Sequence, residues 1–101
     1  YYKELHKNKS FIIFPRNKNE TPWSFDLYSK KTKKIKKLLM KNNIMSRDVY
    51  PPLNSQKIYK HIKGLKISNF FCKNGLWLPS SLNLKKNDII GICKIINNEF
   101  R

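Results

Sequence analysis

The end of the chain carries the pattern that most restricts its fold. Apolar side chains recur there at intervals of three and four residues, which is the spacing of one face of an α-helix. The residues on this face are Ile89, Ile92, Cys93, Ile96 and Phe100. Because a helix must bury such a face against another element, the chain is expected to form at least two packed layers.

Further helices are predicted upstream. One follows Ser29, whose hydroxyl is expected to cap it, and runs to about Asn42 with lysines on its solvent face. Its buried stripe consists of Ile35, Leu38 and Leu39. Residues 1–9 are typical of a helix end. A short helix is predicted to begin at Ser68 and to be closed by a left-handed Asn74-Gly75 cap.

Four segments read as short strands: residues 11–15, 22–29, 44–50 and 76–79. The second alternates and places Trp23, Phe25 and Leu27 on one face, so all three are expected in the core, as is Trp77 in the fourth. Strands and helices in this order predict an α+β fold in two layers. Helices would pack on one face of a small, mostly antiparallel sheet.

The chain has 101 residues, 40% of them hydrophobic, which suffices for one small core. We therefore expect residues 1–101 to form a single domain. No apolar run is long enough to cross a membrane, and no membrane partner is expected. Because the sequence begins at Tyr1 without a methionine, it is interpreted as an excised part of a longer protein.

Cysteine and histidine usage argues against a metal site. Cys72 and Cys93 lie in apolar patterns without metal-type spacing, so we expect buried free thiols in a reducing, cytoplasmic compartment. His6 and His61 have no ligand spacing and are expected at the surface.

The net charge of +16 allows two interpretations. One is an anionic partner such as nucleic acid. The other is compositional drift toward lysine, asparagine and isoleucine in an AT-rich genome. Arginine, which suits bidentate contacts to bases, occurs only at Arg16, Arg47 and Arg101, so drift is preferred and no nucleic-acid partner is expected.

Five segments occur in an order that resembles one family. They are YYKEL, PWSFDLY, NNIMSRDVYPPLNSQKIY, NGLWLPSSLNL and NDIIGICKII. Together they resemble the C-terminal end of the DegT/DnrJ/EryC1/StrS pyridoxal-phosphate-dependent sugar aminotransferases, over essentially the whole chain. RDVYPPLNSQ followed by GLWLPSS is the most specific part.

The resemblance implies the small C-terminal domain of an enzyme with the aspartate aminotransferase fold. The large domain, with its Schiff-base lysine and cofactor-binding groups, would be missing, so no catalytic residue is expected in this chain. The full-length enzyme would be a homodimer that binds pyridoxal phosphate. It would transfer an amino group from glutamate or a similar donor to a nucleotide-linked keto-sugar. The fragment alone would bind no cofactor and be inactive.

The resemblance also places Arg47, Tyr50 and Asn54 at a substrate-binding cleft. Arg47 would hold a carboxylate or phosphate, while Tyr50 would hydrogen-bond or stack on substrate. Pro51 and Pro52 would stiffen the turn that directs Asn54 into the cleft. Alternatively, Arg47 pairs with Asp26 or Asp48, and Tyr50 packs on the sheet.

Two other functions stay open from the sequence alone. One is a small basic nucleic-acid-binding protein. The other is a non-catalytic interaction domain derived from the aminotransferase small domain.

Overall fold

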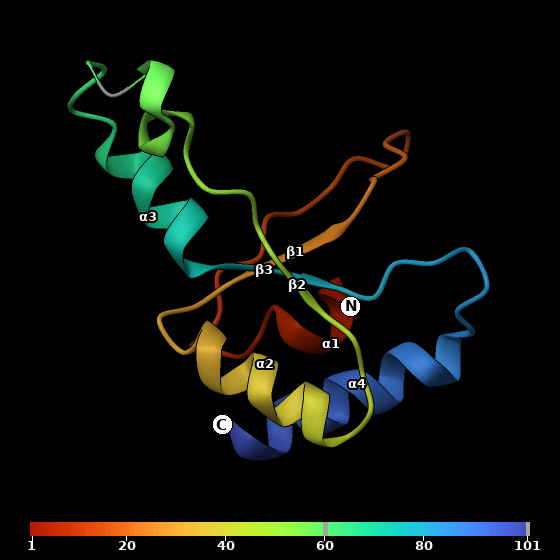
Figure 1. The fold of residues 1–101 in the computed structure, drawn as a ribbon. Coiled ribbons are helices and arrows are strands. Elements are labelled where there is room, and N and C mark those ends of the chain that lie inside the picture. Colours follow the sequence, from red (N-terminus) through yellow and green to blue (C-terminus); the bar gives the residue numbers. More distant parts are fainter. Residues whose placement is uncertain (60, 101) are drawn as a thin grey trace.

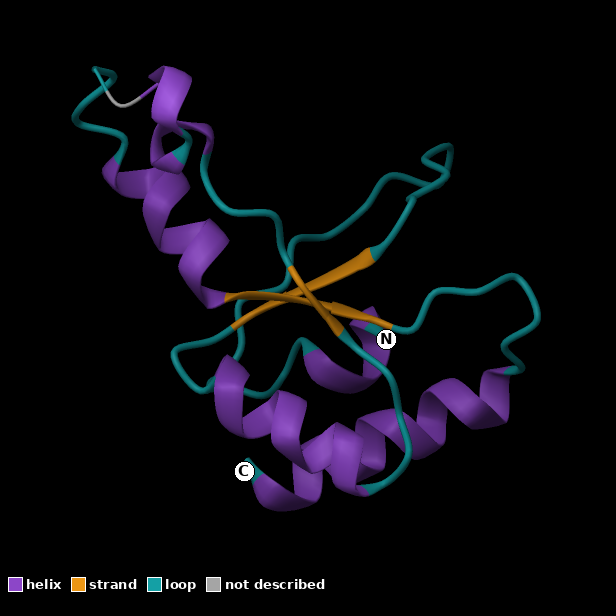
Figure 2. Ribbon diagram, viewed as in Figure 1, coloured by secondary structure: helices purple, strands orange, loops and turns teal. Residues whose placement is uncertain are grey.

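The computed structural model describes residues 1–59 and 61–100, which form a small sheet with three helices on one side and a fourth that extends away from it (Figures 1 and 2). The helices are α1 (Tyr2–Leu5), α2 (Thr32–Lys41), α3 (Lys66–Asn74) and α4 (Lys86–Glu99). The strands are β1 (Phe25–Tyr28), β2 (Arg47–Asp48) and β3 (Gly75–Leu78). Two short 3-10 turns, η1 (Leu53–Ser55) and η2 (Lys57–Tyr59), lie between β2 and α3.

The sheet has the strand order β1-β3-β2, and both strand pairs are antiparallel. Trp77 at the centre of β3 pairs with Asp26 of β1 on one side and with Arg47 of β2 on the other. In Figure 1, α1, α2 and α4 lie together below the sheet. The predicted two-layer α+β fold is confirmed.

The core lies between the sheet and these three helices. Its buried side chains come from α1, α2, α4, β1 and β3, and from Phe11 and Phe100, which lie outside these elements: Leu5, Phe11, Leu27, Ile35, Leu39, Leu76, Leu78, Ile92, Cys93, Ile96 and Phe100. The predicted helical stripes are therefore confirmed, with Leu38 and Ile89 packed at the edge of the core.

Neither tryptophan belongs to this core, so the prediction for both is wrong. Trp23 is 93% exposed because it lies two residues before β1 begins, where the chain no longer follows the sheet. Trp77 is half-buried, because it points to the sheet face opposite the buried Leu76 and Leu78.

Two strand predictions need correction. Residues 11–15 form only a single bridge, between Ile12 and Tyr28, because Phe11 turns into the core instead of extending a ladder. Of residues 44–50, only Arg47 and Asp48 pair with β3. In both segments the apolar pattern overestimated burial as well as the length of backbone pairing, since Ile12, Phe14 and Met45 are 44%, 54% and 84% exposed.

The predicted helix caps also differ. α2 begins at Thr32, with Lys31 as its N-cap, although the Ser29 hydroxyl still accepts a hydrogen bond from the Lys31 amide at 3.1 Å. α3 begins two residues before Ser68, so that serine is inside the helix. Gly75 has a φ of −91° because the chain passes straight from α3 into β3 without a left-handed turn.

Residues 51–59 and 61–74, here called the arm, extend away from the sheet in Figure 1. Their apolar side chains are partly or largely exposed: Leu53, Ile58, Tyr59, Ile62, Leu65, Ile67 and Phe70. In the proline loop Tyr50 and Leu53 are exposed, whereas Pro52 and Asn54 are half-buried.

Both cysteines are free thiols; Cys93 is buried as expected, whereas Cys72 is only half-buried. His6 and His61 are exposed as expected. Within residues 1–59 and 61–100, no helix is long and apolar enough to span a bilayer.

Candidate functional site

The two faces of the sheet carry different side chains. Residues along a strand alternate between faces, and directly paired residues of neighbouring strands share one. Leu27, Leu76 and Leu78 face the helices and are buried. Asp26, Trp77 and Arg47 therefore lie side by side on the opposite face, which none of α1, α2 and α4 covers. Arg47, the first of the three predicted site residues, lies on this open face.

Arg47 is exposed on this face, and no salt bridge to it occurs within the described part of the chain. Asp26 is bound by Arg16, whose guanidinium lies 2.9 Å from its carboxylate. Asp48 is bound by Lys36 of α2. The alternative that Arg47 pairs with Asp26 or Asp48 is therefore wrong, and its guanidinium is left to face solvent.

Tyr50 packs against Trp77, the residue that pairs with Arg47 across the strands. The rings of Tyr50 and Trp77 meet edge to face, with centroids 4.9 Å apart, while 65% of Tyr50 stays exposed. Pro52 then holds an extended backbone, with φ −64° and ψ 143°, before η1 begins. The structure thus brings Arg47 and Tyr50 together around Trp77, and Tyr50 combines the packing role with an accessible hydroxyl-bearing ring.

Asn54 lies apart from this pair, within η1 of the arm. It is half-buried, and its Oδ1 atom is buried without a hydrogen-bond partner among the described residues. A buried acceptor without a donor costs about 1–3 kcal/mol. A donor from a ligand or another part of the protein would remove that cost.

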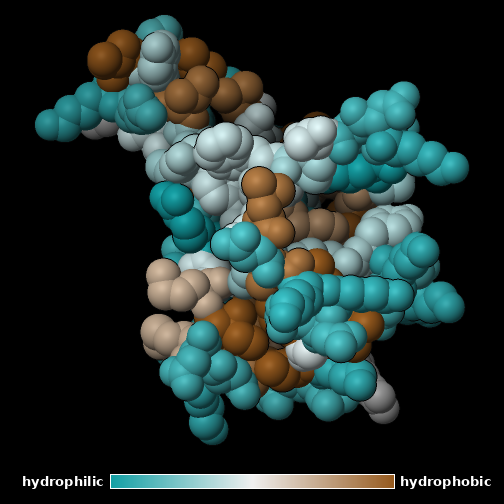
Figure 3. Space-filling model, turned by 90° about the vertical axis from the view of Figure 1, so that its right-hand side faces the viewer, coloured by the Kyte–Doolittle hydropathy of each residue, from teal (hydrophilic) through white to brown (hydrophobic). Residues whose placement is uncertain are grey.

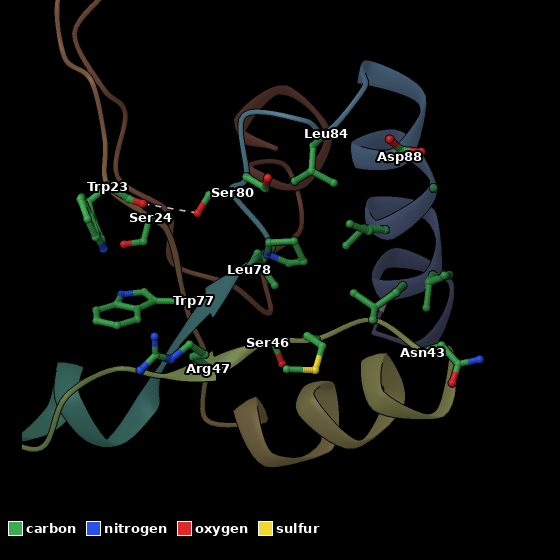
Figure 4. Close-up of a pocket in the computed structure, with 17 residues that line it drawn as sticks. Trp23, Ser24, Asn43, Ser46, Arg47, Trp77, Leu78, Ser80, Leu84 and Asp88 are labelled. Carbon is green, nitrogen blue, oxygen red and sulfur yellow. Dashed lines mark hydrogen bonds between the residues drawn. The ribbon is translucent and has the colours of Figure 1, made fainter.

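A groove of about 660 Å³ opens beside Arg47 (Figure 4). Its walls are residues 43–47, which lead into β2, residues 77–81, which lead out of β3, and the α4 side chains around Ile92. Figure 3 shows apolar surface emerging between hydrophilic side chains over the helical layer. Trp23, Trp77 and Arg47 lie at one end of the groove, and Asp88 lies at the other.

Sequence reasoning missed this groove. Its walls come from four segments that are far apart in the chain, and none of them alone has a binding motif. One available signal was the position of Trp23 directly after the polar residues 16–21 and Pro22, which favours exposure over burial.

Hydrogen bonds fix the backbone on both sides of the groove mouth. Ser80 Oγ donates to the Trp23 carbonyl at 3.4 Å, and Arg16 donates to the Ser24 carbonyl at 3.2 Å. The hydroxyl of the half-buried Tyr1 donates to the Pro79 carbonyl at 2.7 Å, and this partial burial raises the pKa of the phenol well above its usual value. Burial, followed by the nearby Asp26 carboxylate, also raises the pKa of Tyr28. Both phenols are therefore neutral at pH 7, and Arg47 is the cationic side chain that lines this end of the groove.

The described lysines do not fit the covalent anchor of pyridoxal phosphate. Each is exposed except Lys36, which is half-buried and donates to Asp48. None of them lines the groove. A Schiff-base lysine needs a desolvated pocket or a neighbouring cation that lowers its pKa. We therefore assign no cofactor-binding lysine to these residues and derive no step through the cofactor.

A family model described as the DegT/DnrJ/EryC1/StrS aminotransferase family matches residues 1–97. No curated protein matched the chain significantly. Two solved structures are similar in fold. A DegT DnrJ EryC1 StrS aminotransferase from Brucella abortus aligns over 98% of this chain with a TM-score of 0.78 and 22% identity. The sugar aminotransferase CalS13 from Micromonospora echinospora aligns over 97% with a TM-score of 0.83 and 16% identity.

The chain is much shorter than these neighbours. The alignments cover 28% of the Brucella abortus chain and 27% of CalS13, so the chain spans just over a quarter of either length.

Proposed function

The chain belongs to the DegT/DnrJ/EryC1/StrS aminotransferase family, and from that premise we propose that it is the C-terminal small domain of a sugar aminotransferase. The whole enzyme would transfer an amino group from an amino acid, glutamate in the first instance, to a nucleotide-linked keto-sugar. The name of CalS13 as a sugar aminotransferase supports this substrate class. In this proposal the full-length enzyme acts as a homodimer.

The observation that carries the proposal is the unpaired guanidinium of Arg47 on the open face of the sheet. The neighbouring carboxylates are engaged elsewhere, Asp26 by Arg16 and Asp48 by Lys36. An arginine forms two parallel hydrogen bonds with a carboxylate or phosphate. Both proposed substrates carry such groups, so we assign Arg47 the binding of a substrate anion.

Tyr50 and Asn54 are assigned supporting contacts in the same cleft. Tyr50 keeps its position through the edge-to-face contact with Trp77, and its exposed part is free to hydrogen-bond or stack on substrate. Asn54 offers an amide whose buried oxygen lacks a donor among the described residues. A hydrogen bond from substrate or from a facing part of the enzyme would satisfy it.

Pyridoxal phosphate supplies the electron sink for amino-group transfer when it is bound. Because the described lysines do not fit its covalent anchor, we place its binding residues in a part of the enzyme beyond this chain. Treating the 101-residue chain with pyridoxal phosphate and borohydride should then label no single lysine selectively. Stoichiometric labelling of one defined lysine, detected by peptide mass spectrometry, would contradict that placement.

The test of Arg47 uses an enzyme that carries this chain as its C-terminal part. Arg47→Ala should lower kcat/KM for transamination by about 10- to 100-fold, the effect of losing a hydrogen bond to a charged group. Arg47→Lys should recover little, because an ammonium cannot reproduce the bidentate geometry. Asn54→Ala should lower kcat/KM by a smaller factor.

Lys37→Ala is the matched control, since it removes one positive charge from the exposed face of α2. It should leave the kinetics unchanged. Unchanged kcat/KM in Arg47→Ala, with circular dichroism showing normal folding, would refute the assignment.

A further inference from the structure

We propose that the arm docks onto a part of the enzyme outside this chain, on a surface that is apolar at its centre and acidic at its rim. The inference rests on the proposed function in one respect only, that the chain is one part of a longer enzyme. It depends neither on the reaction nor on the substrate. The alignments cover just over a quarter of two similar enzymes, so most of such an enzyme is available as the partner.

The helix of the arm is the first line of support. α3 is 9 residues long and has no buried side chain. A helix shorter than about 12 residues is marginal in water, and packing of its apolar face usually stabilises it. α3 has such a face, because Ile67, Phe70 and Phe71 lie three and four residues apart. Since Ile67 is 76% exposed, this face lacks a packing partner at its outer end.

The inner end of the same face holds the arm in place. Phe71 packs edge to face against Tyr28 of β1, with centroids 4.8 Å apart, and contacts the ring of Phe14 at 5.6 Å. α3 also continues directly into β3 at Gly75, where the neighbouring atoms leave no room for a Cβ atom. The arm therefore projects in a fixed direction, and little conformational entropy is lost when a partner binds it.

The outer end of the arm is apolar as well. Leu53 and Ile58, in the two 3-10 turns, are 63% and 78% exposed. Apolar side chains gather at the top of the molecule in Figure 3, where the arm ends in Figure 1. Such clusters on a protein surface mark interaction sites. Asn54 adds a polar group, because its buried Oδ1 atom has no donor among the described residues, and the partner would supply one.

Charge identifies the chemistry of the partner. The sequence contains no aspartate or glutamate between Asp48 and Asp88, a stretch that includes the whole arm. The arm instead carries exposed lysines among its apolar side chains: Lys57, Lys63, Lys66 and Lys73. Protein interfaces place polar groups around an apolar centre and match opposite charges across the contact. The surface that fits the arm therefore carries carboxylates at its rim.

The same charge argues against the arm of a second copy as the partner. In a two-fold symmetric contact, the lysines of one arm would face the lysines of the other. Neither arm has a carboxylate to place between them. Like charges that face each other across an interface are unfavourable. The occupant is therefore the remaining part of the enzyme.

Cross-linking by a carbodiimide tests the contact in an enzyme that carries this chain as its C-terminal part. The reagent joins an amine to a carboxylate that already touches it. Peptide mass spectrometry should find Lys63 or Lys66 joined to carboxylates outside residues 1–101. Lys33 and Lys37, also exposed but on α2, are the matched controls and should form no such links. Absence of these links from the arm would overturn the inference.

Amide hydrogen exchange measures the docking itself. The α3 amides should exchange at least about 10-fold more slowly in the whole enzyme than in the 101-residue chain, because docking suppresses local opening. Ile67→Asp places a carboxylate at the apolar centre and should return exchange in the enzyme to the faster rate. Leu82→Asp makes the same change at an exposed residue outside the arm and should leave α3 exchange unaltered. Equal α3 exchange in the enzyme and the chain would refute the docking.

Two measurements on the 101-residue chain test other occupants of the arm. Analytical ultracentrifugation should show a monomer, and a dimer that Ile67→Asp dissociates would show that a second copy covers the arm. No single-stranded oligonucleotide should bind through the arm at about 0.15 M salt. Binding that is lost in Lys63→Glu but kept in Lys37→Glu would assign the arm to nucleic acid. Either result would overturn the inference.

Cross-linking and exchange are measured without substrate, so their outcome is separate from that of the proposed function. A protected arm in an enzyme that does not transaminate would refute the enzymatic proposal alone. An unprotected arm in an active aminotransferase would refute the docking alone.

Discussion

The two faces of the sheet are built from the same three strands and have opposite characters. Toward the helices, Leu27, Leu76 and Leu78 are at most 2% exposed. On the open face, Trp77 is half-buried and Arg47 is exposed without a carboxylate partner among the described residues. The first face holds the fold together, and the second presents groups that the fold does not need for stability.

Free energy explains this difference. A buried leucine stabilises the fold by about 1.5–3 kcal/mol through removal of apolar surface from water. An exposed guanidinium or indole contributes little. We therefore expect substitutions on the covered face to change stability, and substitutions on the open face to change ligand binding.

The most direct test of this difference between the two faces is to substitute two adjacent residues of β3. Leu76→Ala should lower the free energy of unfolding by about 2–5 kcal/mol, because it opens a cavity in the centre of the core. Trp77→Phe, on the other face, should cost less than about 1 kcal/mol, since the ring still meets Tyr50. Urea denaturation followed by circular dichroism measures both. Similar losses for the two would show that the open face also carries the fold.

The next largest effect is a pH dependence on the covered face. Burial raises the pKa of the Cys93 thiol to about 11 from its ordinary value of 9.0. The folded state thus keeps the thiol proton that the unfolded state loses. The protonated Cys93 thiol therefore contributes to the free energy of unfolding. This contribution is fully present below pH 9, falls as pH rises from 9 to 11, and amounts to about 3 kcal/mol at most.

Cys93→Ala separates this effect from the titration of tyrosines and lysines in the same range. Urea titrations between pH 8 and 11 should show a steeper loss of stability in wild type than in the variant. Parallel curves would mean that the thiol is already accessible to water. Cys72→Ala, which alters the half-buried thiol, is the matched comparison.

The covered face was predictable from sequence because helical periodicity and strand alternation both encode burial. The stripes of Ile35, Leu39, Ile92 and Ile96 lie where the spacing placed them. The pattern does not determine how far backbone pairing extends, so residues 11–15 were predicted as a strand and form one bridge.

The open face was predictable only in part. Family resemblance directed attention to Arg47, Tyr50 and Asn54, and their substrate roles stay predictions. Trp23 was wrongly placed in the core because its alternation with Phe25 continues the strand pattern, while the ladder begins only at Phe25. The groove needs segments around residues 23, 45, 79 and 91 to meet, and that proximity depends on tertiary packing.

A smaller effect on stability is expected for a substitution at Gly75, where α3 of the arm joins β3 of the sheet. A Cβ atom added there would lie 2.5 Å from Val49 Cγ2 and 2.8 Å from the Phe71 carbonyl oxygen. The backbone oxygen cannot move without distorting the end of α3. Gly75→Ala should therefore destabilise the protein by about 1–3 kcal/mol, the usual cost of overpacking. Thermal or urea denaturation measures it, and a neutral result would show that β3 and α3 adjust freely.

The smallest effect on stability is expected at Gly91, where substitution by alanine should stabilise the protein rather than destabilise it. Gly91 lies inside α4 and lines the groove, and a Cβ atom added there would meet no heavy atom within 4 Å. Alanine is favoured over glycine in a helix interior by about 0.5–1 kcal/mol, so Gly91→Ala should stabilise the protein by that amount. The longer side chain of Gly91→Leu should keep the helix but project into the groove. Urea denaturation should therefore show no loss of stability in either variant. Reduced stability in Gly91→Ala would contradict the open space that the structure shows beside this glycine.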